Sequence, residues 1–125
     1  MNKITIKDSA GIDKEFNVIR QPAGSQSAIL MLTVTGAGMN RTANPKIELS
    51  APQSQGRSTP VVTVTVPYGA VVNGNYQKED QVVFVHSAKQ PPTAPEMARL
   101  DAEAFARNVV ANPQVMALFK DGVIS

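Results

Sequence analysis

Hydrophobic and polar residues alternate along two stretches in the middle of the chain, residues 46–51 and 61–66. Successive side chains of a β-strand point to opposite faces of a sheet, so this pattern predicts two strands that are buried on one face only. The apolar face carries Ile47, Leu49, Ala51, Val62, Val64 and Val66. The opposite, polar face carries Lys46, Glu48, Ser50, Thr63 and Thr65, and Gln81 is expected to join it from a later strand.

Further stretches extend this sheet toward the N-terminus. Residues 2–7 and 14–20 predict a β-hairpin with Gly11 in its turn. Residues 28–35 predict a strand that is apolar on both faces in its first half, so we expect it to be covered on both faces or to lie at an interface. The glycine-containing residues 36–45 are interpreted as a flexible connection.

The strongest turn signal in the chain is Asn73-Gly74, a pair that favours the tight turn of a β-hairpin. We expect a long protruding hairpin or loop over residues 67–76, and a last strand over residues 77–86. Residues 52–60 are interpreted as a turn segment. Two inward-facing sets remain open for the last strand, either Val82 with Phe84 or Val83 with Val85.

Two helices are predicted in the C-terminal part of the chain, over residues 93–125. Thr93 and Glu96 have the spacing of a capping box, which predicts the start of the first helix. Asn112 followed by Pro113 predicts the cap and first turn of the second helix, and Gly122 its left-handed end. The whole pattern predicts an α+β fold, an antiparallel β-meander with an N-terminal hairpin and two C-terminal α-helices.

The first helix has more apolar surface than one sheet can cover. Arg99, Glu103 and Arg107 form one narrow charged strip, with charge pairing four residues apart. Apolar side chains occupy most of the remaining circumference, among them Met97, Leu100, Phe105 and Val109. We therefore predict that these residues form the interface of a homodimer, and a helix buried within a monomer is the alternative.

Composition restricts the class of protein. The 125 residues fit a single domain, and the absence of cysteine excludes disulfides and thiolate chemistry. The N-terminal residues lack the apolar run of a secretion signal, and no stretch is apolar enough to cross a membrane, so we expect the chain to remain in the cytoplasm where it is made. The net charge of +2 permits a polyanionic partner without requiring one.

The sequence does not suggest an enzyme, a cofactor or a metal site. His86 is the only histidine and lacks the spacing of a catalytic triad or a metal site. Two close acidic pairs, Glu79 with Asp80 and Asp101 with Glu103, are best interpreted as solvated charge. No phosphate-binding glycine loop or nucleophile motif is present. The polar face of the sheet remains, either as a solvated surface or as an RNA-binding one, although its centre lacks the aromatic side chain that usually stacks on bases.

The order of these elements resembles the coat protein of the small single-stranded RNA bacteriophages, the leviviruses. The resemblance covers the whole chain, and its most specific parts are the strand ending in Val64-Thr-Val-Pro67 and the helix pair of residues 93–119 with its Asn-Pro corner. It implies a single coat-protein-like domain over residues 1–125, with the hairpin in 1–20, the sheet strands in 27–88 and the helices in 93–125. It also implies a dimer with one continuous sheet, in which the helices of each subunit lie across the sheet of its partner.

A capsid function follows from this resemblance. It implies a subunit of an icosahedral shell in the virion, made in the bacterial host cytoplasm, that encloses single-stranded genomic RNA and represses replicase translation by binding an RNA hairpin. Carried over by strand, the RNA-binding residues are Lys46, Glu48, Ser50, Thr63, Thr65, Glu79 and Gln81. The residues expected at contacts between dimers are Tyr68, Asn73, Gly74 and Tyr76.

The chain also departs from this family. Glu79 stands about where well-studied members have a stacking tyrosine, and Pro52 and Thr63 stand where they have basic residues. These differences favour non-specific packaging over recognition of one hairpin. The alternative hypothesis is a dimeric RNA-binding or regulatory module that forms no shell.

Overall fold

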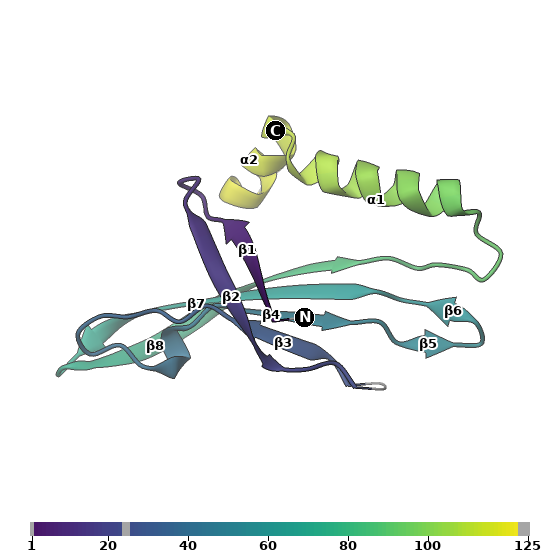
Figure 1. Cartoon of the computed structure of the whole chain (residues 1–125). Coiled ribbons are helices and arrows are strands. Elements are labelled where there is room, and N and C mark those ends of the chain that lie inside the picture. The colour runs from purple at the N-terminus through teal and green to yellow at the C-terminus, as the bar shows by residue number, and fades with distance from the viewer. Residues whose placement is uncertain (1, 24–25, 123–125) are drawn as a thin grey trace. The chain divides into compact units, whose positions relative to one another are not determined.

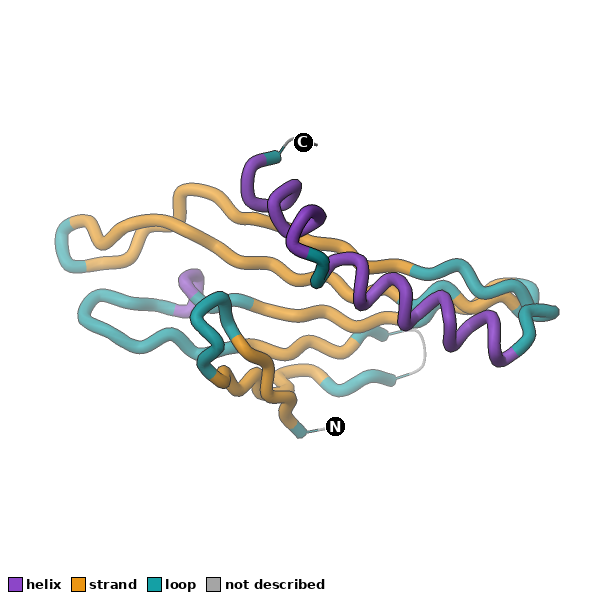
Figure 2. Tube along the Cα trace, turned by 90° about the horizontal axis from the view of Figure 1, so that it is seen from above, coloured by secondary structure: helices purple, strands orange, loops and turns teal. Residues whose placement is uncertain are grey.

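The computed structural model describes residues 2–23 and 26–122, which fall into two compact units, Met1–Lys89 and Gln90–Ser125. Figures 1 and 2 show that the first unit is a β-sheet with its loops and that the second consists of two helices. Each unit is described by itself below. That the two form one domain over residues 1–125 stays a prediction.

The first unit is built on a six-stranded antiparallel sheet in the order β1-β2-β3-β4-β7-β8. Its strands are β1 (Lys3–Lys7), β2 (Asp13–Arg20), β3 (Ala28–Met31), β4 (Lys46–Ser50), β7 (Val61–Val72) and β8 (Asn75–Ser87). Strands that follow one another along the sheet also follow one another along the chain, apart from a small hairpin between β4 and β7. The predicted antiparallel meander is therefore confirmed.

The core lies on one face of this sheet. Across it, Val18, Leu30, Ile47, Val64 and Phe84 occupy facing positions on five adjacent strands. Leu30 is fully buried and Ile47 is 4% exposed, and Phe16 completes the most buried cluster. The predicted alternation is confirmed for Ile47, Leu49, Val62 and Val64, which all belong to this cluster or pack against it. Of the other two predicted apolar positions, Ala51 lies beyond the end of β4 and Val66 is 43% exposed.

The N-terminal hairpin has the predicted strands, and its turn is held by one carboxylate. The Asp8 side chain accepts hydrogen bonds from the backbone N–H groups of Ala10 (2.9 Å) and Ile12 (3.0 Å). Gly11 in the same turn has φ +78°. The hydrogen bond from Ile12, helped by that from Ala10 and by the charge of Lys14, lowers the pKa of Asp8 although some desolvation opposes this.

The third strand is shorter than predicted. β3 ends at Met31, whereas the apolar pattern suggested a strand to residue 35. Beyond it, the Leu32 N–H donates to the carbonyl of Pro45 (3.0 Å) and the Val34 N–H to the Asn44 side chain (2.9 Å). The bond from Leu32 continues the β3–β4 register to the residue before β4, and backbone pairing ends where the Asn44 side chain accepts the Val34 N–H.

The connection of residues 36–45, which was predicted to be flexible, has a defined local structure. It contains a short 3₁₀ helix, η1 (Arg41–Ala43), capped by the side chain of Asn40. The Asn40 side chain also donates to the carbonyl of Tyr76 (2.9 Å), and the Tyr76 N–H donates to the carbonyl of Gly38 (2.6 Å). Both views show this loop beside the end of the β7–β8 hairpin (Figures 1 and 2), so the loop is fixed to the sheet.

The segment predicted as a turn over residues 52–60 is itself a hairpin. It consists of β5 (Gln53–Ser54) and β6 (Arg57–Ser58), which pair with each other in a separate two-stranded sheet. Gln55 and Gly56 between them both have positive φ angles, 54° and 76°. Two consecutive left-handed residues form the two-residue turn that matches the twist of paired strands, which is why the segment pairs with itself.

The second unit contains α1 (Glu96–Val110) and α2 (Pro113–Asp121). The predicted capping box is wrong, because α1 begins after Pro95 and has no side-chain cap. Thr93 instead lies in a turn in which the Ala94 N–H donates to the carbonyl of Pro91 (3.1 Å). The predicted cap of the second helix is confirmed, since Asn112 accepts from the Gln114 N–H (2.9 Å) and Pro113 lies in the first turn.

The end of α2 is also as predicted. Gly122 has φ +76°, and its N–H donates to the carbonyl of Leu118 (2.7 Å). The last part of the predicted segment, residues 123–125, lies outside the described residues. No helix in the described part of the chain is long and apolar enough to span a membrane.

Candidate nucleic-acid interface and assembly surfaces

The predicted RNA-binding residues of β4 and β7 share one face of the sheet. Lys46 lies opposite Thr65, and Glu48 lies opposite Thr63. Ser50 follows on the same side of β4. This is the face opposite the core, called the polar face below. Most of its side chains are half-buried, and Thr65 is 7% exposed.

The last strand contributes both polar and apolar residues to the polar face. Gln81 lies opposite Pro67, so it shares the side of Thr65. The next positions on that side are Val83 and Val85, which are 48% and 58% exposed. Of the two inward sets that the sequence left open, the structure therefore selects Val82 with Phe84 for the core face, since Phe84 pairs with Val64.

Glu79 occupies an irregular position in this strand. The pairing shifts between Tyr68 and Gly69, whose partners are Asp80 and Lys78, so Glu79 is the extra residue of a β-bulge. The bulge brings Lys78 to the polar side, where its ammonium group donates to the Gln81 side chain (2.6 Å). Sequence reasoning missed Lys78, because simple alternation cannot anticipate an inserted residue.

A second cation that sequence reasoning missed lies at the other end of the polar face. Arg20 lies opposite Ile29, which lies opposite Glu48, so the three occupy one row across β2, β3 and β4. The Arg20 guanidinium is 3.9 Å from the Glu48 carboxylate. Beside the paired acid Glu48, the polar face carries the cations Arg20, Lys46 and Lys78. On the N-terminal hairpin the same side carries Lys3 and Lys7, which are paired with Glu15 (3.1 Å) and Asp13 (2.8 Å). The cations around Glu48 can attract a polyanion.

The residues expected at contacts between dimers lie on one long hairpin. β7 runs to Val72 and β8 begins at Asn75, so of the hairpin or loop expected over residues 67–76 the structure shows the hairpin. Asn73 and Gly74 have φ angles of 52° and 82°, which confirms the predicted tight turn. Val71 and Val72 continue the strand up to this turn, opposite Tyr76 and Asn75.

The two tyrosines of this hairpin differ in exposure. Tyr68 is 48% exposed, whereas Tyr76 is 8% exposed. Tyr76 is bonded through its backbone to Gly38 and Asn40. Tyr68 is therefore the more accessible of the two for contacts between subunits, and a role for Tyr76 in such contacts stays a prediction.

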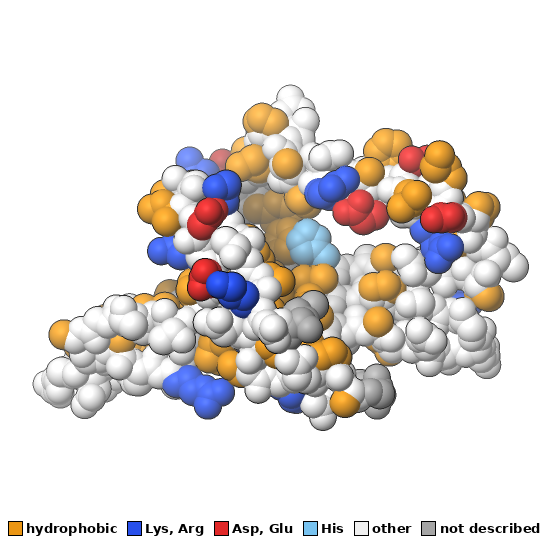
Figure 3. All heavy atoms as spheres, viewed as in Figure 1, with side chains coloured by type: hydrophobic (Ala, Val, Ile, Leu, Met, Phe, Trp, Pro, Cys, Tyr) orange, Lys and Arg blue, Asp and Glu red, His pale blue; other side chains and the backbone are white. Residues whose placement is uncertain are grey.

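The apolar residues of α1 are exposed in the single chain. Met97, Leu100, Phe105 and Val109 are 68%, 56%, 72% and 51% exposed. Figure 3 shows hydrophobic side chains at the surface of the helical unit beside charged ones, and the charged strip contains the predicted pair of Arg107 with Glu103 (3.5 Å). Four large apolar side chains on one helix constitute a surface that another element is expected to cover.

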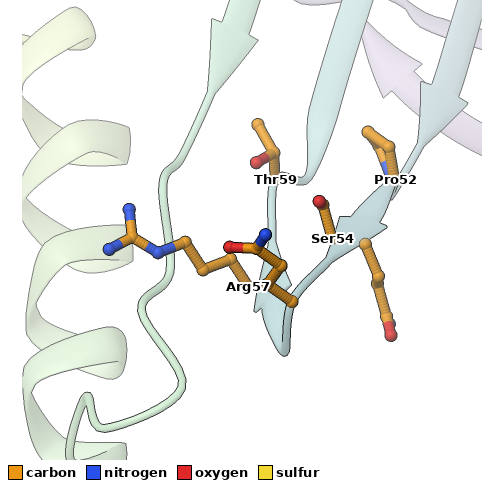
Figure 4. Close-up of a pocket in the computed structure, with 6 residues that line it drawn as sticks. Pro52, Ser54, Arg57 and Thr59 are labelled. Atoms are coloured by element: carbon orange, nitrogen blue, oxygen red, sulfur yellow. The ribbon is translucent and has the colours of Figure 1, made fainter.

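One shallow hollow lies at the β5–β6 hairpin (Figure 4). Its lining residues are Pro52, Gln53, Ser54, Gln55, Arg57 and Thr59. Arg57 is the only charged residue among them, so they lack the acid and base of a hydrolytic site. Within residues 2–23 and 26–122, no three histidine, aspartate or glutamate side chains gather as metal ligands. His86 contacts the ring of Phe84, with 4.5 Å between ring centroids, on the core face.

The fold is similar to solved structures of bacteriophage coat proteins. A virus-like particle of bacteriophage NT-214 matches with a TM-score of 0.86 at 16% identity, over 100% of this chain and 98% of the other. A virus-like particle of Beihai levi-like virus 21 matches with a TM-score of 0.84 at 11% identity, over 98% and 95%. The capsid protein of bacteriophage GA matches with a TM-score of 0.70 at 15% identity, over 96% and 94%. No family model and no curated protein sequence matches this chain.

Proposed function

We propose that this chain, whose fold is that of levivirus coat proteins, is a capsid subunit that dimerises and assembles into an icosahedral shell around single-stranded RNA. The observation that carries the proposal is the end-to-end similarity of fold to proteins of virus-like particles, which leaves almost no part of either chain unmatched. On this proposal the protein is located in the virion and has no enzymatic role.

Dimerisation is supported by the exposed apolar surface of α1. Covering Met97, Leu100, Phe105 and Val109, each more than half exposed, contributes on the order of 1–2 kcal/mol per side chain. The sheet also ends at β8, whose outer edge has no neighbour among the described strands. Pairing of two such edges extends the sheet across the dimer and removes an exposed edge that favours aggregation.

Contact with RNA is supported by the polar face. Hydroxyl, amide and ammonium groups of the kind found at Ser50, Thr63, Gln81 and Lys46 bind phosphates and base edges without requiring one sequence. Tyr76 is too buried to stack on a base, and Glu79 cannot do so. We therefore propose packaging of the genome through many weak contacts, and we do not propose a tight complex with one operator hairpin.

Expression of the full-length protein without other viral components tests the proposal. The product is separated by size exclusion, its absorbance ratio at 260 and 280 nm is read on the eluted peak, and the same fraction is examined by negative-stain electron microscopy. Uniform round particles with nucleic-acid absorbance are expected. Dimers that stay dimers at high concentration would instead identify the RNA-binding module without a shell. Empty particles would support the shell and contradict the RNA contact.

A further inference from the structure

Arg20 reaches the polar face because β2 contains a β-bulge. Val18 pairs with Leu30 and Arg20 pairs with Ile29, so Ile19 is an inserted residue. Strict alternation would place Arg20 on the same side as Val18, among the core residues. The insertion reverses this and places Arg20 in line with Glu48, which itself lies opposite Thr63.

Arg20, Ser27 and Glu48 form a connected polar cluster. The Arg20 Nε donates to the carbonyl of Ser27 (2.9 Å), and its Nη2 donates to the Ser27 hydroxyl. That hydroxyl in turn donates to Oε1 of Glu48 (2.6 Å), which lies 3.9 Å from Arg20 Nη2. The serine hydroxyl thus uses both its acceptor and its donor capacity to link the two charges.

The negative charge of Glu48 opposes the binding of a polyanion to the polar face. It projects from the middle of the polar face, between Lys46 and Ser50 along β4, and an unpaired carboxylate there repels phosphates. The cluster opposes this repulsion by placing a guanidinium next to the carboxylate. Its contribution to folding stability is expected to be small, because both side chains are 41% exposed and such pairs are screened by water.

We infer that Arg20 is a positioning residue of the RNA-binding face, which holds the Glu48 carboxylate through Ser27 and neutralises it so that the RNA backbone can approach Lys46 and Thr63. The inference rests on the proposed RNA contact. It assigns a role to two residues, Arg20 and Ser27, that lie outside the predicted RNA-binding set, and it gives Glu48 an indirect role through its pairing.

The role of Arg20 is tested with three forms of the full-length protein: the unsubstituted chain, Arg20→Ala, and Arg20→Ala combined with Glu48→Gln. Binding of a fluorescein-labelled 20-nucleotide oligouridylate is measured by anisotropy between 0.1 and 1 M salt, with the assembly state checked by light scattering. Without Arg20, the unneutralised Glu48 carboxylate is expected to cost the RNA one phosphate contact, that of the neighbouring Lys46. The loss of one such contact lowers the salt slope by about 0.7, which corresponds to roughly fivefold weaker binding at the low-salt end. Arg20→Ala should show that loss, and the double variant should bind within about twofold of the unsubstituted chain.

Lys14→Ala is the matched control. Lys14 is also 41% exposed and also lies 3.9 Å from its acidic partner, Asp8, but it belongs to the N-terminal hairpin, opposite Ile6 on the core side. The Lys14→Ala variant should bind the oligouridylate as well as the unsubstituted chain does. All variants should keep the melting temperature of the unsubstituted chain within a few degrees.

The outcomes separate the inference from the proposed function. Arg20→Ala binding as well as the unsubstituted chain would overturn the inference. So would a double variant that stays as weak as Arg20→Ala, because Arg20 would then be a direct phosphate ligand or a brace for its loop. An unsubstituted chain that binds no oligouridylate would contradict the RNA contact itself.

Discussion

Replacement of Gly38 by alanine should destabilise the protein through the close approach of its loop to the β7–β8 hairpin. Gly38 has φ +77°, and a Cβ atom there would lie 2.5 Å from the carbonyl oxygen of Gly74 and 2.9 Å from Cγ1 of Val71. The first of these is a backbone atom, so it cannot move aside as a flexible side chain would. The loop must therefore shift away from the hairpin.

The size of the effect follows from what that shift breaks. A left-handed alanine costs about 1–2 kcal/mol. Moving the loop also loses the hydrogen bond from the Tyr76 N–H to the Gly38 carbonyl and that from Asn40 to the Tyr76 carbonyl. Each contributes roughly 0.5–1.5 kcal/mol, so the total loss for Gly38→Ala is about 2–5 kcal/mol.

Gly11→Ala provides the matched control, because Gly11 has nearly the same backbone angle, φ +78°, and nothing lies within 4 Å of its Cβ position. The free energy of unfolding of Gly11→Ala should fall only by the cost of the left-handed alanine, about 1–2 kcal/mol. Urea unfolding of both variants at one protein concentration measures the difference, since the stability of an oligomer depends on concentration. Equal losses would refute the argument that the loop is held against the hairpin, as would fast hydrogen exchange of the Tyr76 amide in the unsubstituted protein.

Three further predictions concern the dimer, the polar face and the N-terminal turn. Phe105→Asp should abolish soluble protein because it places a charge in the proposed dimer interface, whereas Arg99→Asp on the charged strip should not; a folded monomer of the first variant would refute the interface. Lys46→Ala with Thr63→Ala should lower the RNA content of purified particles and leave assembly intact, and unchanged RNA content would show that RNA binds elsewhere. The pKa of Asp8 lies below its ordinary value of 3.8, chiefly because of the hydrogen bond from the Ile12 N–H. Its contribution to stability is therefore present above pH 3.8 and lost as the pH falls through the lowered pKa; a carboxyl NMR titration with a midpoint at or above 3.8 would contradict this.

Local signals predicted those elements whose structure depends on neighbouring residues. The alternation in residues 61–66, the Asn73-Gly74 turn and the Asn112 cap each require only short-range geometry, and the structure confirms all three. The Thr93 capping box failed, although its spacing is correct, because adjacent prolines impose a turn there and Pro95 takes the capping position. The spacing of a capping box shows which side-chain hydrogen bonds can form at a helix start, and the conformation of the neighbouring backbone determines which of them do form.

The candidate site was predictable only in part. Lys46, Glu48, Thr63 and Thr65 follow from alternation along single strands, and register places them together. The cations that complete the polar face depend on inserted residues in β2 and β8, which alternation treats as regular positions. Arg20 was therefore assigned to no surface, and Lys78 was not considered.

The sequence by itself determined the kind of protein this is, an antiparallel meander followed by two helices with more apolar surface than one chain covers. That information is carried by periodicity and by turn and cap residues, which act over a few positions. Only the tertiary structure decided which side each side chain of the last strand faces, where the loop of residues 36–45 is fixed, and that Arg20 is paired with Glu48. These features arise where segments distant in the sequence meet, and a single inserted residue reverses every face assignment beyond it.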